Sequence, residues 1–424
     1  MNNDELQVLG TEKRKSKSNT WKWIVAAVFV VLSIVCYLIY NRCSSTAHSL
    51  PMSQEGLTIS PALQHAADSL LNDKLTEING LQGQVIIMNV QTGEILAMAG
   101  RERNFEGKFQ PCQNFAYQQE LGSLMKTASL LIALETGKAH LSDIVDVGNG
   151  VWQIDDDRII KDHNWRRGGY GKVTLDRALE VSSNIGISKT IWSLFKGHEQ
   201  DYFNKLDSMS FGQPSSIEGI NGLRASIYSS PKDSDWVNKD ILWSAIGYNR
   251  KIAPIQMLTF YNAIANNGKM VKPTLMPGTT EVINEQIAKK ENIALMQQTL
   301  EHVVSQGLGR KAGSYIIQVA GKTATSQVNE YYEGDNTVSE YQLAFCGFFP
   351  ADAPKYSMIV SMNKLGLPAS GGGMAGDLFH YIVEWMIAHD MPSLSVLDEE
   401  TGDRVKITES TINKANEILQ RQEK

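Results

Sequence analysis

"QVAGKTATSQV", residues 318–328, contains a Gly-Lys-Thr triplet that admits two interpretations with different folds. A phosphate-binding P-loop needs another glycine five residues before the Gly of this triplet, so that successive backbone N–H groups surround a phosphate. That position is Ile316 in this chain. Residues 324–332 also lack the apolar period of about 3.6 residues expected of the helix that follows a P-loop. The stretch therefore argues against a nucleotide-binding fold, and its Lys-Thr pair is predicted to lie on a strand.

Size and charge limit the class of protein. The chain has 424 residues and a formal net charge of -6 at pH 7. This length predicts about two or three domains and provides for a large core. The acidic balance, with no basic block that contains interleaved aromatic residues, argues against a nucleic-acid partner. His198 and Glu199 begin like a zinc-protease motif, but no histidine follows three residues later, so we predict no metal site.

Residues 24–40 form an uncharged apolar run that spans roughly 26 Å as a helix, about one membrane hydrocarbon core. Several basic residues precede this run: Lys13, Arg14, Lys15, Lys17 and Lys22. Only Arg42 follows it closely, so the positive-inside rule predicts a cytoplasmic N-terminus and an extracytoplasmic remainder. The alternative is a cleaved signal peptide. A retained anchor is favoured because the run is long for a signal peptide and no small-x-small site follows closely.

Beyond the run, strands are predicted at both ends of the chain with helices between them. Two apolar runs around Gln-Thr-Gly in residues 83–100 predict a hairpin. Further strands are predicted at 315–320, 341–349 and 356–362. Helical spacing of apolar residues covers 123–136, 174–195, 254–266 and 377–389. This order predicts one sheet assembled from the two ends of the chain.

The cysteines do not form a disulfide framework. Two lie in or beside the apolar run (Cys36, Cys43) and two in the body of the chain (Cys112, Cys346). A bridge between Cys112 and Cys346 would suit an oxidising compartment, whereas two small buried thiols are the favoured alternative.

A candidate nucleophile lies in "ELGSLMKTASLLIALETG", residues 120–137. Ser123 follows a glycine at the start of a predicted helix, and Lys126 lies one turn later on the same face. A lysine whose pKa is depressed by burial and by neighbouring cations can accept the serine proton. The helix N-terminus adds positive potential and a backbone N–H for a developing oxyanion.

Two further elements separate this serine from chance. Ser-x-x-Lys alone is weak evidence, because it also occurs at Ser193/Lys196, Ser229/Lys232 and Ser361/Lys364. "EVSSNIGISK" adds Ser182 and Asn184, a hydroxyl to relay protons and an amide to hold a substrate carbonyl. Lys322-Thr323-Ala324-Thr325 adds a cation, two hydroxyls and a strand edge for an extended peptide.

Ser-x-x-Lys, Ser-x-Asn and Lys-Thr-Gly, in this order, are typical of penicillin-binding proteins and serine β-lactamases. Roughly residues 82–388 resemble the transpeptidase domain of class B penicillin-binding proteins. The resemblance extends to a collinear set of segments: QTGEILAMAG, LETG, GNGVW, GYGKVTLDRALEVSSNIG, AIANNGKMVKPTL, GLGRKA, VAGKTATSQ and FCGFFPADAPKYSMIV. It implies an α/β (α+β) fold, with an antiparallel sheet flanked by helices and an all-helical subdomain, preceded here by one transmembrane helix.

The resemblance also gives the expected organisation of the chain. We expect a cytoplasmic tail, an anchor, a linker with a short N-terminal segment, the transpeptidase domain and a C-terminal tail. Their ranges are 1–20, 21–41, 42–80, 81–391 and 392–424. The tail carries a weakly amphipathic stretch near 412–419, interpreted as a surface helix or a frayed end.

By resemblance, the motif residues take the family's roles in peptidoglycan crosslinking. Ser123 would attack a D-Ala-D-Ala stem peptide, Lys126 would be the general base, and Ser182 would relay a proton to the leaving amine. Asn184 would bind the substrate amide. The third motif would bind the terminal carboxylate through Lys322 and Thr323, and the backbone N–H groups of Ser123 and Thr325 would form the oxyanion hole.

The same resemblance implies partners and alternatives. It implies covalent binding of β-lactams, no organic cofactor, and a membrane glycosyltransferase as a partner at the cytoplasmic membrane. The first alternative is a β-lactam hydrolase or sensor, which the absence of a Glu-x-x-Leu-Asn motif and the Ser-x-Asn form of the second motif disfavour. The second is a catalytically silent wall scaffold, which the complete set of motif residues disfavours.

The sequence departs from the family at two points. Class B members carry a large non-catalytic module between anchor and transpeptidase domain, whereas only about forty residues intervene here. The third motif has Ala324 where the family has glycine. If the Ala324 methyl group points into the groove, it should hinder bulky β-lactams. If it points to the other face of the sheet, it is a neutral packing change.

Overall fold

The computed structural model describes residues 56–333, 336–389, 391, 394–397 and 404–422. These residues all belong to one compact unit of the chain, residues 49–424. The predicted membrane span, residues 24–40, lies outside the described residues. Within the described part, no helix combines the length and the apolar character needed to cross a membrane.

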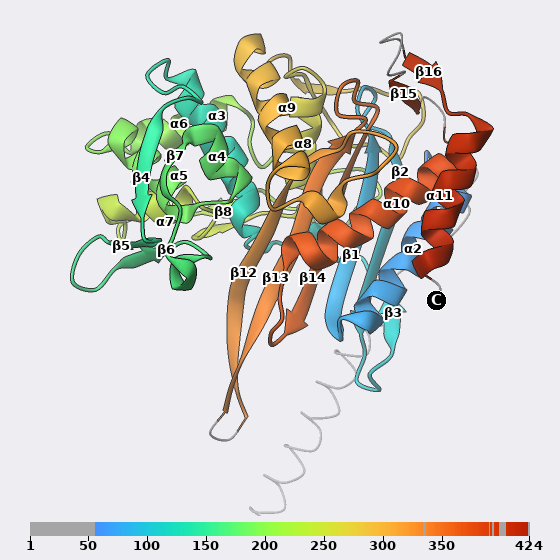
Figure 1. Cartoon of the computed structure of the whole chain (residues 1–424), viewed down its shortest axis with the longest axis horizontal. Helices are drawn as coiled ribbons and strands as arrows, with labels where there is room; N and C mark the ends of the chain where they lie inside the picture. Colours follow the sequence, from blue (N-terminus) through green and yellow to red (C-terminus); the bar gives the residue numbers. More distant parts are fainter. Residues whose placement is uncertain (1–55, 334–335, 390, 392–393, 398–403, 423–424) are drawn as a thin grey trace, which may run out of the picture. The chain divides into compact units, whose positions relative to one another are not determined.

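A six-stranded antiparallel sheet forms the centre of this unit, with strand order β12-β13-β14-β1-β2-β3 (Figure 1). Its strands are β1 (Gly80–Asn89), β2 (Ile95–Arg103), β3 (Phe109–Pro111), β12 (Ala320–Glu333), β13 (Asn336–Phe349) and β14 (Tyr356–Leu365). Val85 of β1 pairs with Val360 of β14, so strands from the two ends of the chain lie side by side. The predicted sheet is therefore confirmed, and β12 lies at its edge.

One predicted strand is misplaced. β12 begins only at Ala320, and residues 315–319, predicted as strand, have no regular structure. The hydroxyl oxygen of Ser314 accepts the N–H groups of Ile316 (3.0 Å) and Ile317 (3.4 Å), which bends the backbone. The apolar run reflects burial instead, because Ile317 is 5% exposed within the core.

Helices α2 (Pro61–Glu77) and α10 (Asp377–Ala388) lie near one another in the layer that covers one face of the sheet (Figure 1). The buried Lys74 joins them, because its Nζ lies 2.6 Å from Asp377 Oδ2. α11 (Glu409–Gln422) packs against α10 and buries Ala415 completely. The amphipathic stretch expected at 412–419 is thus a helix docked on the domain.

The opposite face is covered by α8 (Pro254–Ala265), in which every residue is buried. Its Asn262 bridges the end of β1 and the start of the neighbouring β14 by donating to Val90 O (3.0 Å) and accepting from Ser357 Oγ (2.7 Å). The remaining helices of this side are α3 (Met125–Glu135), α4 (Leu175–Glu180), α5 (Asn184–Phe195), α6 (Gln200–Ser208), α7 (Ile241–Ser244) and α9 (Lys290–Ser305). They form one hydrophobic core with this face of the sheet.

The described residues also form short two-stranded sheets outside the central sheet. They pair β4 (Ile144–Gly148) with β7 (Gly171–Thr174), β5 (Val151–Gln153) with β6 (Ile159–Lys161), β8 (Ile227–Tyr228) with β9 (Arg250–Lys251), β10 (Met270–Val271) with β11 (Val282–Asn284), and β15 (Ser395–Leu397) with β16 (Arg404–Lys406). The β5–β6 hairpin lies at the helical end of the molecule, beside β4 and β7 (Figure 1). Cys112 and Cys346 are both buried and unpaired, as favoured from the sequence.

Candidate active site

Ser123 lies in a 3-10 turn, Gly122–Leu124, that leads directly into α3. This turn is clamped from two sides. A Cβ atom on Gly122, whose φ is +49°, would overlap Ser326 Oγ of β12, and one on Gly247 would overlap the carbonyl of Gly122. The buried Tyr261 of α8 fixes the turn further by donating its hydroxyl to Leu124 O at 3.0 Å. Ser123, the candidate nucleophile, therefore sits on a rigid support between helix and sheet.

Lys126 is fully buried in the first turn of α3. Its Nζ donates to Ser182 O at 2.6 Å and to Ser182 Oγ at 3.2 Å. Among the described residues, no carboxylate lies within ion-pairing distance of it. Burial therefore lowers the pKa of Lys126 to about 7, although the negative charge of Asp162 acts in the opposite direction. A neutral amine is accessible at neutral pH.

Residues 174–195 do not form one helix as their apolar spacing predicted. The helix breaks at Val181–Ser183, and Ser182 has the left-handed φ of 53°. Asp162, which is 1% exposed, stabilises the break by accepting from Ser183 Oγ (2.7 Å) and from the N–H of Ile185 (3.0 Å). The break turns Ser182 towards Lys126.

The third motif lies on β12 next to this pair of residues. Lys322 is fully buried, and its Nζ donates to Thr323 O (3.0 Å) and Thr323 Oγ1 (3.4 Å). Burial, and secondly the positive charge of Lys126, hold the pKa of Lys322 well below its usual value. Thr325 Oγ1 accepts the N–H of Gly371 at 2.8 Å, which joins the strand to the loop before α10.

Five of the predicted residues line one cavity of about 310 Å³: Ser123, Ser182, Asn184, Thr323 and Thr325. Lys126 and Lys322 are buried and do not line it. Ala324 does not line it either. Its methyl group is 2% exposed and belongs to the core on the helical side of the sheet. The structure thus brings the three motifs together around one open site.

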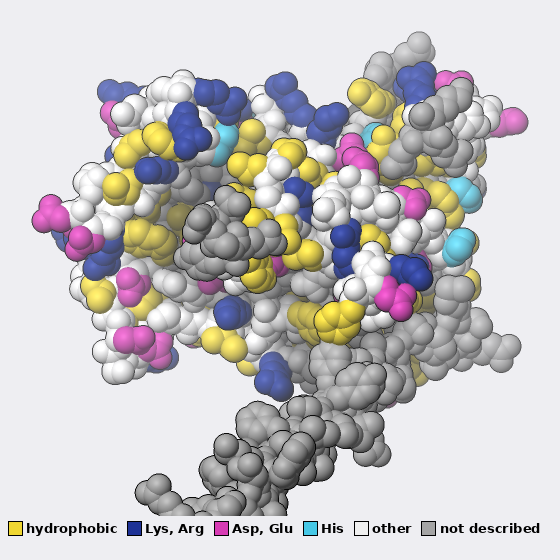
Figure 2. Space-filling model, turned by 90° about the horizontal axis from the view of Figure 1, so that it is seen from below, with side chains coloured by type: hydrophobic (Ala, Val, Ile, Leu, Met, Phe, Trp, Pro, Cys, Tyr) yellow, Lys and Arg dark blue, Asp and Glu magenta, His cyan; other side chains and the backbone are white. Residues whose placement is uncertain are grey.

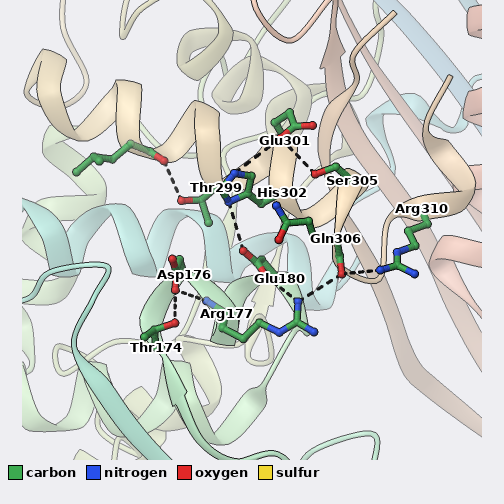
Figure 3. Close-up of polar contacts among 11 residues, drawn as sticks. Thr174, Asp176, Arg177, Glu180, Thr299, Glu301, His302, Ser305, Gln306 and Arg310 are labelled. Carbon is green, nitrogen blue, oxygen red and sulfur yellow. Dashed lines mark hydrogen bonds and ion pairs between the residues drawn. The ribbon is translucent and has the colours of Figure 1, made fainter. Parts of the chain in front are cut away.

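A polar cluster behind the second motif holds α4 against α9 (Figure 3). The buried carboxylate of Glu180 accepts from Arg177 Nη1 at 2.7 Å and lies 3.5 Å from His302 Nδ1. The backbone carbonyl of Glu180 accepts the N–H of Leu308 at 3.1 Å, and Leu308 lines the cavity. This cluster links the second motif to the segment that leads into β12.

Comparison with known proteins agrees with this geometry. The family model described as penicillin binding protein transpeptidase domain matches residues 83–384. The chain belongs to this family. It is 28% identical over 335 residues to Stage V sporulation protein D of Bacillus subtilis, covering 73% of this chain and 49% of the relative. It is 23% identical over 338 residues to peptidoglycan D,D-transpeptidase FtsI of Escherichia coli K12, covering 76% and 52%.

Solved structures share the fold of this transpeptidase domain. The transpeptidase domain of penicillin-binding protein 3 from Burkholderia pseudomallei superposes with a TM-score of 0.67 at 23% identity, covering 81% of this chain and 99% of that one. Penicillin binding protein 3 from Mycobacterium tuberculosis superposes with a TM-score of 0.64 at 22% identity, covering 79% of each chain. Our chain spans about half the length of the first curated relatives it matches.

Sequence reasoning missed several residues of the candidate site. His163, Tyr248, Leu308, Ser326 and Ser370 also line the cavity. The His163 imidazole interacts with Tyr170 OH at 3.1 Å, and burial, followed by the charge of Lys126, lowers its pKa. These residues lie between or outside the three motifs, so spacing alone gives no signal for them.

The packed methyl group of Ala324 supports the neutral interpretation of this departure from the family. We expect Ala324→Gly to acylate a small and a bulky β-lactam with the same ratio of rates as the wild-type chain. It should lower the free energy of unfolding by roughly 1 kcal/mol, because a strand interior loses packing and the unfolded chain gains freedom. Acylation kinetics and urea unfolding check both expectations. A selective gain for the bulky drug would instead mean that the methyl group narrows the groove.

Proposed function

We propose that this chain is a membrane-anchored serine D,D-transpeptidase that crosslinks peptidoglycan stem peptides and binds penicillin covalently. The observation that carries the proposal is the buried Lys126 amine, which contacts Ser182 and has no acidic partner among the described residues. A base that is neutral near pH 7, one turn from an anchored serine, suits nucleophilic catalysis. Family membership and the open cavity beside Ser123 support the same conclusion.

In the proposed acylation, Ser123 Oγ attacks the carbonyl of the penultimate D-Ala while Lys126 accepts its proton. The backbone N–H groups of Ser123 and Thr325 would hold the oxyanion, and such a donor is worth roughly 3 kcal/mol in related serine sites. As the C–N bond breaks, a proton passes through Ser182 Oγ to the departing D-Ala amine. The Ser182 hydroxyl suits this relay, because Lys126 Nζ donates to it at 3.2 Å.

The substrate would be held by groups on both sides of the cavity. Asn184 would bind the peptide amide and Thr323 the terminal carboxylate, while the buried Lys322 would act on that carboxylate from behind Thr323, to whose Oγ1 it donates at 3.4 Å. An amine from a neighbouring stem peptide would then attack the ester and transfer its proton to the departing Ser123 Oγ. The new amide bond between the two peptides is the crosslink. Among the described residues, the side chains that line the cavity include no Asp or Glu to activate water, which favours transfer to an amine over hydrolysis.

Labelling with penicillin tests this proposal. Full-length protein in detergent should form a stable adduct at Ser123, because the strained lactam mimics the D-Ala-D-Ala amide. Peptide mass spectrometry should locate the adduct, and Ser123→Ala should abolish it. No adduct, or one that persists in Ser123→Ala, would reject the enzyme in favour of a silent scaffold. Rapid release of hydrolysed drug would identify a β-lactamase.

The pH profile tests the role of Lys126. Because burial lowers its pKa to about 7, the amine is protonated below this value and neutral above it. We therefore expect the penicillin acylation rate to rise through about pH 7 and then level off. Lys126→Arg keeps a cation that cannot deprotonate, so acylation should fall at least ~100-fold at every pH. A flat profile in the wild-type chain, with an active arginine variant, would contradict the assignment.

We further propose that residues 24–40 anchor the chain in the cytoplasmic membrane with the catalytic domain outside. The charge asymmetry around this run supports the orientation. Alkaline phosphatase fused after Lys424 should be active and a cytoplasmic reporter at the same place silent; the reverse pattern would separate the enzyme from its substrate.

We also propose a membrane glycosyltransferase as a partner, which would supply the glycan strands. Its failure to co-purify with the full-length chain would argue against that partner.

A further inference from the structure

The segment 161–172, KDHNWRRGGYGK, borders the cavity on the side of the second motif. Asn184 Nδ2 donates to Lys161 O at 2.7 Å, which fixes the start of the segment beside the motif. His163, two residues later, lines the cavity together with Ser182 and Asn184. The chain then turns at Trp165–Arg167 and returns along β7. The segment is therefore a rim of the site held at a fixed place.

This rim is rich in basic side chains. Its basic residues are all exposed: Lys161, Arg166, Arg167 and Lys172. Among the described residues, none of these side chains forms an ion pair or a side-chain hydrogen bond. The one acidic residue of the segment, Asp162, is buried and faces Ser183 and Ile185.

The tip of the β5–β6 hairpin differs from the rim, because its Asp155 is ion-paired. There Asp155 is bound by Lys239 at 2.8 Å and by Arg158 at 3.5 Å, so opposite charges compensate one another. Figure 2 shows basic, acidic and hydrophobic side chains close together at the end of the molecule that carries this hairpin. Asp155 at the hairpin tip is therefore ion-paired, whereas the four rim cations have no ion-pair partner among the described residues.

Trp165 organises two of the rim cations. Its ring is 37% exposed, with Lys161 Nζ at 4.6 Å and Arg166 Cζ at 5.0 Å from its centroid. Stacking on an aromatic ring restricts long side chains without using their hydrogen-bond donors. The Arg166 guanidinium therefore remains available to bind a carboxylate in a bidentate manner.

We propose that this rim, chiefly Arg166 and Arg167, binds the carboxylates of the acceptor stem peptide and directs its amine towards the acyl-enzyme. This rests on the transpeptidase function proposed above. The third motif lies on β12 and the rim on the opposite, helical side of the cavity, so both peptides can be present together. Surrounding cations also disfavour protonation of an incoming amine, which must be neutral to attack.

Binding by an inactive chain separates this proposal from the reaction itself. Full-length Ser123→Ala protein is titrated calorimetrically with a synthetic acceptor stem peptide, with its carboxylates either free or amidated. We expect R166Q/R167Q in this background to bind the free-acid peptide about tenfold more weakly and the amidated peptide unchanged. Arg158→Gln is the matched control, because its guanidinium is already paired with Asp155 (3.5 Å) and Asp240 (3.6 Å). R166K/R167K should restore most of the affinity.

Two further measurements use the chain with Ser123 in place. R166Q/R167Q should be acylated by penicillin within twofold of the wild-type rate, while its KM for the free-acid acceptor rises about tenfold. Equal losses for the free and amidated peptides, or unchanged affinity for both, would overturn the proposal. If the variant misfolds, the proposal is tested instead by measuring peptide binding to the Ser123→Ala chain, with its rim unchanged, at increasing ionic strength. Binding of the free-acid peptide must then weaken much more than binding of the amidated peptide. Failure of penicillin labelling in the wild-type chain would instead reject the transpeptidase function alone.

Discussion

The contact between the Gly122 carbonyl, Gly247 and Ser326 is the constraint on which the site depends. The Gly122 backbone contacts the Gly247 backbone on one side and the Ser326 side chain of β12 on the other. Neither Gly122 nor Gly247 can carry a Cβ atom there. This close approach brings the first turn of α3 against β12, so two motifs more than a hundred and ninety residues apart share one wall. Tyr261 of α8 donates its hydroxyl to Leu124 O and so fixes the same turn to the hydrophobic core.

The electrostatics of the site follow from this close packing. Two lysines, Lys126 and Lys322, are buried without an ion-paired carboxylate among the described residues, and the charge of Lys126 further lowers the pKa of Lys322. Burial of unpaired ammonium groups is costly, so the pKa falls and the proton is lost instead. The surrounding core thus gives Lys126 a pKa of about 7, which suits the role of general base proposed for it.

Much of this arrangement was readable from the sequence, and its limits have physical causes. The hairpin, the sheet formed from both chain ends and the three motifs were all predicted, because periodicity and turn residues are local signals. The break at Ser182 was not, since the apolar spacing of α4 and α5 runs through it. That break depends on Asp162, some twenty residues earlier, and tertiary contacts of this kind leave no local pattern. His163 and Leu308 were missed for the same reason.

The pairing of β1 with β14 has a consequence for how the chain is made. Gly80 lies opposite Lys364, so the central hydrogen-bond ladder cannot form until almost the whole domain has been synthesised. Non-local pairings of this kind are slow to form, and they leave β1 with an open edge meanwhile. During that interval the β1–β2 hairpin is exposed to pairing with other chains. Biogenesis of this domain should therefore be most sensitive to crowding and chaperone supply before its last strands emerge.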